Sequence, residues 1–326
     1  MSDTVTKAKL SLLKLVYPPV SNQEASWLQS DPEVEAEFRA SDFYMIAGRA
    51  EAKFSSLAVD PDTHLISFHI SIGANLIDAV QIQPNDLPAI ANKNLDSFWV
   101  EAGEKLIRIW DGPVKGPGSN VLDWFTTEKL LWDRSRAVPG ISLLNKYREM
   151  MTYDLLYVGI AKVGDSFDRL IKNGHKARME ILSNENQRLT SSRVTDEIYL
   201  FLFHVEPLVV QMFEPDHAFT EEDFSGSIDR KPIVADAEKA FVSLLKPDYN
   251  IVKFQSYPRG ADSLYGSDYA RYGYAIAENI LFNTMHGRFR GGWDVIRQNV
   301  SNEADSIFVE GEAVQFYKSG VDYPSD

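Results

Sequence analysis

Hydrophobic and polar positions alternate along much of the first third of the chain, and this alternation predicts β-strands. Residues 8–16 fit a first strand, and strict period-two patterns follow over Thr63–Ile72, Leu76–Ile82 and Phe98–Trp110. The last of these contains an Ala-Gly-Glu turn at its centre, which predicts a hairpin. We therefore expect a β-rich N-terminal domain over residues 1–115.

Other segments favour helices or buried strands. Ser30–Ala50 and Val121–Arg134 carry apolar residues at helical spacing, whereas Tyr153–Ile160 and Asp196–Val205 are continuous apolar runs typical of buried strands. A further helix is expected from Ala235 to Leu245, since Pro247 follows it and cannot continue a helix. A strand pair is expected around Ser306–Tyr317.

Gly112–Ser119 is the clearest linker in the sequence, because three glycines and two prolines occur in eight residues. We place a domain boundary there. The prediction is an α+β protein with three parts: the β-rich domain, a central domain over residues 120–255, and a C-terminal extension over residues 256–326 that packs on the others. Glu206–Pro232, rich in acidic residues and proline, is expected to be a surface insertion.

Candidate chemistry is concentrated in the central part of the chain. The strand that contains Tyr157, Val158 and Gly159 leads into a segment with no acidic residue between Arg169 and Arg178, although the whole chain has a formal charge of −14. Glycine in a strand allows another backbone or a ligand to approach closely. The basic side chains after it include Arg169, Lys172, His175, Lys176 and Arg178.

Tyr157-Val158-Gly159, followed by Arg169, resembles the second half of the signature of the GIY-YIG nuclease family. The resemblance extends to Glu238 and Asn250, which stand twelve residues apart as in that family; Asn250 ends a Lys-Pro-x-x-Asn segment that begins at Lys246. It covers roughly Tyr147 to Phe254. The resemblance implies a central domain with a small mixed sheet flanked by helices, and an endonuclease that hydrolyses phosphodiester bonds.

The resemblance also implies roles for individual residues. Tyr157 would act as a general base or orient the attacking water, Arg169 would stabilise charge on the scissile phosphate, and Glu238 would bind a divalent metal. His175 can exchange a proton near neutral pH. Tyr147, ten residues before Tyr157, stands where the family has its Gly-Ile-Tyr strand, although the glycine and isoleucine are absent. Asn250 completes the catalytic set, and the expected substrate-binding residues are Gly159, Lys162, Lys172, Lys176 and Arg178.

Each of these assignments has a structural alternative. Tyr157 can be an ordinary strand tyrosine, and Arg169 can form an ion pair with Asp165 one helical turn away. Glu238 can be a solvated acid near a helix N-terminus, where the helix dipole favours negative charge. The basic side chains can form a solvated helix face.

Composition restricts the function further. The chain has no cysteine, so a metal would be held by carboxylate, amide or imidazole groups, which favours Mg²⁺ or Mn²⁺. The sequence offers neither an apolar run long enough to cross a bilayer nor a secretion signal, so we expect a cytoplasmic protein without a membrane partner. The chain has 47 acidic and 33 basic residues. This excess of negative charge predicts weak nonspecific binding to nucleic acid, DNA or RNA, unless the basic residues are concentrated on one surface.

A second function stays open at this point. The missing Gly-Ile-Tyr strand and the negative charge are compatible with a non-catalytic binding or regulatory module that keeps the nuclease scaffold. For a nuclease, the same charge would require concentrated basic residues, a small substrate, or a protein partner that delivers the substrate; an oligomer of the chain also stays open. The two hypotheses differ in geometry: catalysis requires Tyr157, Arg169 and Glu238 to converge on one concave face.

Overall fold

The computed structural model describes residues 6–93, 97–161, 165–172, 174–213, 221 and 228–322 of the chain and shows a mixed α/β architecture. Its largest element is a ten-stranded sheet with the order β15-β14-β11-β3-β12-β1-β13-β18-β19, in which β2 also pairs with β12. Two pairs, β1 with β13 and β11 with β14, are parallel, and the other pairs along this sheet are antiparallel. The bounds are β1 Thr6–Leu15, β2 Val20–Ser21, β3 Phe43–Gly48, β11 Thr152–Ile160, β12 Ile198–Met212, β13 Tyr269–Ile276, β14 Leu281–Thr284, β15 Gly287–Arg290, β18 Ser306–Glu310 and β19 Ala313–Tyr317.

Both faces of the sheet centre are buried, because side chains alternate between two hydrophobic cores. Along β3, Phe43 and Met45 join one core, while Tyr44 and Ile46 join the other. The same alternation runs along the first half of β12. Successive side chains of a strand point to opposite faces, so a continuous apolar run is what a doubly covered strand requires.

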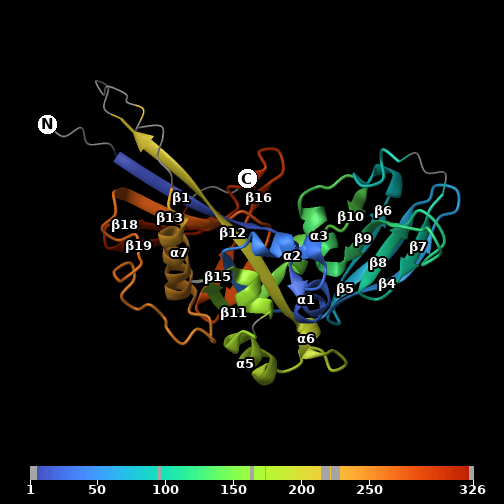
Figure 1. Cartoon of the computed structure of the whole chain (residues 1–326), viewed down its shortest axis with the longest axis horizontal. Coiled ribbons are helices and arrows are strands. Elements are labelled where there is room, and N and C mark those ends of the chain that lie inside the picture. The colour runs from blue at the N-terminus through green and yellow to red at the C-terminus, as the bar shows by residue number, and fades with distance from the viewer. Residues whose placement is uncertain are drawn as a thin grey trace.

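Helices cover these two faces. The long helix α7 (Arg230–Leu245) contributes to the larger core, and α1 (Asn22–Leu28), α2 (Pro32–Arg39) and α5 (Lys176–Asn184) contribute to the smaller one. Figure 1 shows α7 and the C-terminal strands toward one end of the molecule and the smaller sheets toward the other. The remaining helical segments are α3 Thr127–Ser135, α4 Tyr147–Met150, α6 Val194–Glu197, η1 Pro84–Asp86 and the π-helical turn η2 Asp168–Lys172.

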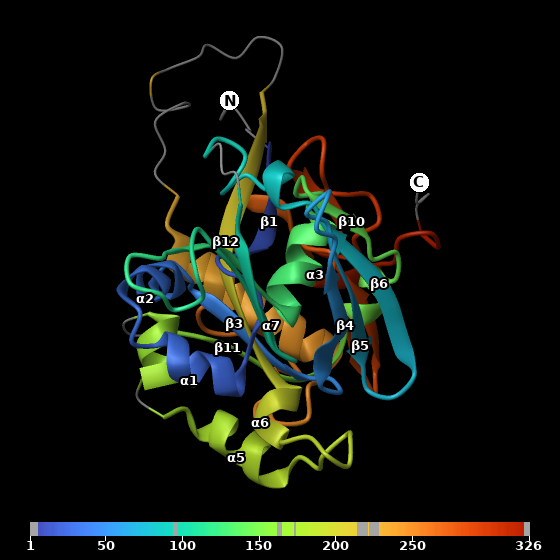
Figure 2. The ribbon, with the colours of Figure 1, turned by 90° about the vertical axis from the view of Figure 1, so that its right-hand side faces the viewer.

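Between β3 and β11 the chain leaves the large sheet and builds two smaller antiparallel sheets, ordered β10-β6-β5-β4 and β7-β8-β9. These strands lie beside α3 in Figure 2. Their bounds are β4 Ala52–Val59, β5 Ile66–Ile72, β6 Leu76–Ile82, β7 Trp99–Ala102, β8 Leu106–Trp110, β9 Val121–Thr126 and β10 Ile141–Leu143; a separate pair joins β16 Trp293–Asp294 to β17 Asn299–Val300.

The large sheet crosses both domain boundaries expected from the sequence. Strands from residues 1–115, 120–255 and 256–326 are hydrogen-bonded neighbours in it. Gly112–Ser119 connects β8 to β9 within one small sheet, and Asp111 accepts hydrogen bonds from the backbone and side chain of Asn120 across its ends. This glycine- and proline-rich stretch is therefore a hairpin loop.

Most expected strands are present, including β5, β6 and the β7–β8 hairpin from alternation, β12 from its continuous apolar run, and the β18–β19 pair, and α7 ends at Leu245 as expected. Two helices differ. Ser30–Ala50 forms only α2 before the chain enters β3, and the first six residues of Val121–Arg134 form β9 before α3 begins. Within the described ranges, every helix is too short or too polar to traverse a lipid bilayer.

Candidate active site

The candidate site lies where β3 begins and β11 ends. These strands are antiparallel, and their register places Tyr44 directly opposite Gly159. The rings of Tyr44 and Tyr157 stack at 6.1 Å between centroids with an interplanar angle of 22°. A Cβ atom on Gly159 would lie 2.7 Å from both rings, so this position requires glycine to admit the two tyrosines.

His175 joins this tyrosine pair from the N-terminus of α5. Its Nε2 lies 3.0 Å from the Tyr44 hydroxyl, and its ring meets both tyrosine rings edge-on. The same residue caps α5, because Nδ1 accepts a hydrogen bond from the backbone N–H of Arg178 at 3.3 Å. Because Nδ1 is the acceptor in a neutral ring, Nε2 carries the proton and donates a hydrogen bond to the Tyr44 hydroxyl oxygen.

Arg169 and Glu238 both influence the pKa values of Tyr44 and Tyr157. Burial disfavours the charge of Arg169, but the Tyr44 and Tyr157 hydroxyls, a hydrogen bond with Tyr44 and the Glu238 carboxylate together raise the pKa of its guanidinium. Burial, followed by Glu238, raises the pKa of Tyr157. Glu238 stands two turns into α7. Tyr44, Tyr157, Arg169, His175 and Glu238 therefore form one cluster drawn from β3, β11, η2, α5 and α7.

The segment carrying Arg169 is held in place by α2. Arg39 donates to Asp165 at 2.5 Å and to Asp168 at 3.0 Å, and its guanidinium lies 4.8 Å from the centre of the Phe167 ring. Asp165 thus has Arg39 as its ion-pair partner, and the alternative pairing of Asp165 with Arg169 is not found. Arg169 is accordingly directed toward the tyrosine pair.

Asn250 positions β11. Its side-chain oxygen accepts from the Val158 N–H at 2.9 Å, and its side-chain nitrogen donates to the Val158 carbonyl at 2.8 Å. Next to it, the Tyr249 N–H donates to the Leu156 carbonyl. The chain after α7 therefore hydrogen-bonds to the backbone of β11 at Leu156 and Val158, the residues before and after Tyr157. Asn250 thereby holds this part of the strand in place.

The titration behaviour of the cluster follows from burial. His175 is only 8% exposed, and burial, together with Arg169 and Arg178, lowers its pKa to about 4. Burial also raises the pKa of Tyr44 far above its ordinary value. The imidazole and both phenols are thus neutral at pH 7, so the tyrosines can orient a water molecule but do not act as phenolates.

Other residues predicted from the sequence lie differently. Tyr147 is on α4, before the start of β11, whereas Tyr157 is near the end of that strand, roughly 17 Å beyond its first residue Thr152 at about 3.3 Å per residue. The Tyr147 hydroxyl accepts from Arg148, and its ring packs beneath Arg134. The tyrosine opposite Gly159 is Tyr44, and Tyr147 is not part of the cluster.

The basic side chains divide into two groups. Lys172 and Lys176 are exposed, although Lys176 lies 3.5 Å from Glu180. Arg178 is directed inward, where it donates to the Asn22 side chain at 2.5 Å and to the Leu170 carbonyl at 2.8 Å. Arg178 therefore holds α5 against α1. Lys162 lies outside the described residues.

The Glu238 carboxylate raises the pKa of both Tyr157 and Arg169. Among the residues that the structure describes, no group of three or more His, Asp or Glu side chains is arranged to hold a metal ion. Mg²⁺ commonly binds through one or two carboxylates while substrate phosphate and water complete its shell. A divalent ion at Glu238 would therefore need a phosphate substrate and water to complete its coordination shell.

Comparisons with protein-family models, with curated proteins and with solved structures found no match.

Proposed function

We propose that this protein is a nuclease that cleaves phosphodiester bonds at a GIY-YIG-like site formed by Tyr44, Tyr157, Arg169, His175 and Glu238. The observation that carries the proposal is the convergence of these side chains from three separate parts of the chain: β3, the consecutive elements β11, η2 and α5, and α7. The family resemblance implies a second tyrosine, on a Gly-Ile-Tyr strand, in addition to Tyr157. Tyr44 stacks on Tyr157 from the adjacent antiparallel strand and would be this second tyrosine.

Each side chain has a role that its surroundings support. Arg169, with its raised pKa, remains charged and offers a planar set of donors to the scissile phosphate. His175 donates to the Tyr44 oxygen and thereby fixes its orientation, which leaves the Tyr44 proton directed toward other partners. Both phenols, being neutral, position the attacking water. Glu238 would hold a divalent ion, Mg²⁺ or Mn²⁺, which polarises the phosphate when bound.

Substrate access would depend on a small basic surface. Lys172 and Lys176 are exposed on the segment that carries Arg169 and His175, and they can attract phosphate locally. The remainder of the chain is strongly acidic and repels a polyanion. The proposal therefore favours a nucleic acid substrate, DNA or RNA, that contacts the protein over only a few phosphates.

The test is a cleavage assay on DNA and RNA substrates with Mg²⁺ or Mn²⁺. Glu238→Ala is expected to abolish cleavage, and Arg169→Ala to slow it by roughly 10²- to 10³-fold, the usual cost of removing one transition-state donor. Retention of full activity in Glu238→Ala would remove the metal assignment. Binding of nucleic acid by the parent protein without cleavage under any of these conditions would favour the non-catalytic module instead.

A further inference from the structure

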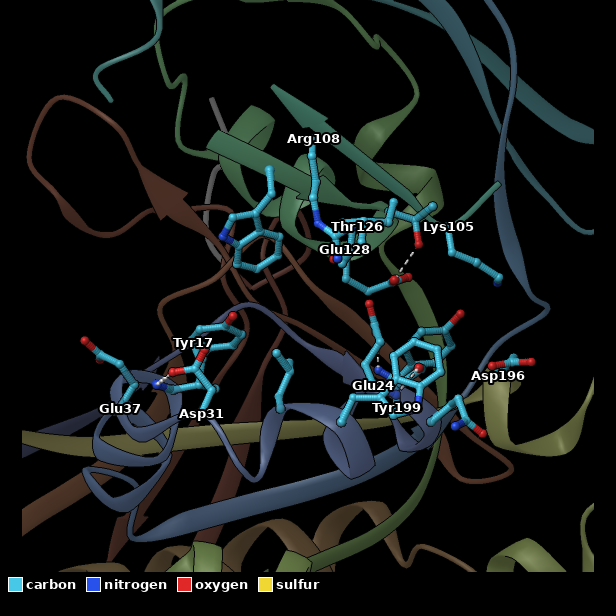
Figure 3. A pocket seen from close by; sticks show the side chains of 18 of the residues that line it. Tyr17, Glu24, Asp31, Glu37, Lys105, Arg108, Thr126, Glu128, Asp196 and Tyr199 are labelled. Atoms are coloured by element: carbon cyan, nitrogen blue, oxygen red, sulfur yellow. Dashed lines mark hydrogen bonds between the residues drawn. The ribbon is translucent and has the colours of Figure 1, made fainter. Parts of the chain in front are cut away.

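Apart from the candidate active site, a cavity of about 600 Å³ lies between helices α1 and α2 on one side and the β7-β8-β9 sheet on the other. Figure 3 shows Glu24, Asp31 and Glu37 on the helical side, with Arg108, Thr126 and Glu128 on the opposite side. None of the residues of the candidate active site lines it. The cavity is large enough for a small molecule of ordinary size.

Its lining is acidic. Six carboxylates line the cavity against two basic side chains, and the carboxylates belong to Glu24, Asp31, Glu33, Glu37, Glu128 and Asp196. The two cations are already engaged by residues outside the lining. Lys105 lies 2.9 Å from Glu51 and donates to the Ala52 carbonyl, and Arg108 donates to Glu101 at 3.0 Å. Glu128 is likewise paired with Arg49 outside the lining, and the other five carboxylates give the lining a surplus of negative charge.

Two of these carboxylates face each other from opposite walls. Glu24 projects from α1 and Glu128 from the start of α3, and Figure 3 shows their carboxylates directed toward one another. Burial, and then the charge of Glu128, raises the pKa of Glu24 to about 7. Glu128 has Arg49 and Thr127 as partners, whereas Glu24 has the Ser21 backbone N–H of its helix cap. A cation between the two carboxylates would relieve this repulsion.

Aromatic groups form the rest of the lining. Tyr17 and Trp124 stack at 6.4 Å with an interplanar angle of 27°, and Trp27 is 66% exposed. The Tyr17 hydroxyl is buried and, among the described residues, has no hydrogen-bond partner. Tryptophan and tyrosine faces attract organic cations through their quadrupoles. An unpartnered buried hydroxyl is costly unless a ligand or water satisfies it.

We propose that this cavity binds a small organic cation, with its ammonium or guanidinium group between Glu24 and Glu128 and its flat apolar body against the tryptophans. An organic cation fits better than a bare metal ion because tyrosine and tryptophan side chains line the cavity beside the carboxylates. The proposal does not depend on nuclease activity, because no residue of the tyrosine cluster contributes to the lining.

Three compounds with one indole body test the charge requirement: tryptamine, its neutral alcohol analogue tryptophol, and the anion indole-3-acetate. Titration calorimetry on the full chain at pH 7.5 should give tryptamine a Kd tighter than about 1 mM, tryptophol at least about tenfold weaker binding, and indole-3-acetate none. Equal affinities for the three compounds, or no saturable binding of tryptamine, would overturn the proposal.

Two variants test the residues. Glu24→Gln should weaken tryptamine binding at least about tenfold while leaving tryptophol unchanged, and glutamine can keep the capping contact with Ser21. Trp27→Ala, at an exposed position, should weaken both compounds. Glu312→Gln removes an equal charge outside the lining and should change neither. A Glu24→Gln protein that binds tryptamine as the parent does would refute the site.

Glu24→Gln also separates binding from a structural role. A carboxylate held beside another carboxylate opposes folding at a pH where both are charged, because repulsion is relieved on unfolding. The variant should therefore be at least as stable as the parent at pH 8, although it binds the cation more weakly. Loss of stability at pH 8 would show that Glu24 serves the fold, and the proposal would be wrong.

Discussion

Replacing His175 with asparagine should remove a specific part of the acid sensitivity of this protein. Asparagine is among the best helix N-caps, so His175→Asn keeps the capping of α5 while removing a titrating ring. The pKa of His175 falls from 6.5 to about 4 on folding because the ring is buried near Arg169 and Arg178. The unfolded chain therefore binds a proton here at a higher pH than the folded chain does.

The sign and size follow from this difference. The contribution of neutral His175 to stability is complete above pH 6.5 and decreases as the pH falls, until it is lost near pH 4. At pH 4.5 the loss is about 2.5 kcal/mol, since each unit of pKa difference corresponds to about 1.4 kcal/mol. His175→Asn should lack this loss, although both proteins share every other titrating group.

Urea unfolding of both proteins from pH 7.5 to 4.5 measures the effect. The difference in unfolding free energy between parent and variant should shift in favour of the variant by about 2.5 kcal/mol across that range. His286→Asn, at an exposed position, is the matched control and should follow the parent. Parallel curves for the parent and His175→Asn would refute the burial of a neutral imidazole against Tyr44.

Three further predictions concern the strand, the glycine and the basic surface. Asn250→Ala should destabilise the protein by about 2–5 kcal/mol in urea unfolding, because it leaves the buried N–H and carbonyl of Val158 without their side-chain partner, and an effect below 1 kcal/mol would contradict this role. Gly159→Ala should reduce cleavage at least about tenfold, since its Cβ would force the tyrosine rings apart, and unchanged kinetics would argue against their stacking. If two to four phosphates are contacted, log Kd plotted against log salt should have a slope of magnitude about 2–4, and joint replacement of Lys172 and Lys176 by Ala should reduce it by about one to two; an unchanged slope would remove these lysines from the binding surface.

The sequence was sufficient for elements defined by local pattern. Period-two alternation predicts β5 and β6, and the apolar run at Asp196–Val205 predicts the first half of β12, because side-chain burial on one or two faces is encoded residue by residue. Pro247 correctly marks the region where α7 ends. The residues Tyr157, Arg169, His175 and Glu238 could be selected for their order along the chain, and the structure brings them together.

Tyr44 could not be selected in the same way, because its partner Tyr157 lies beyond the whole inserted segment and strand pairing at that distance leaves no local signal. The apolar run Phe43–Gly48 is the one usable indication, since a fully buried run after a short helix is typical of a central strand. We expected a helix there, as acids and apolar residues alternate just before it. The composition of Gly112–Ser119 predicts a linker, but the segment is a hairpin loop. Glycine and proline mark a turn, and a hairpin loop needs a turn as much as a linker does.

The most direct test of the proposed site compares cleavage by Tyr44→Phe and Tyr147→Phe under single-turnover conditions with Mg²⁺ or Mn²⁺. Both changes remove one hydroxyl from one tyrosine, but only Tyr44 lies opposite Gly159 and within 3.0 Å of His175. Tyr44→Phe should slow cleavage by about 10²-fold or more, and Tyr147→Phe should cleave at the parent rate. If Tyr147→Phe loses activity and Tyr44→Phe retains it, the site is not at the junction of β3 and β11.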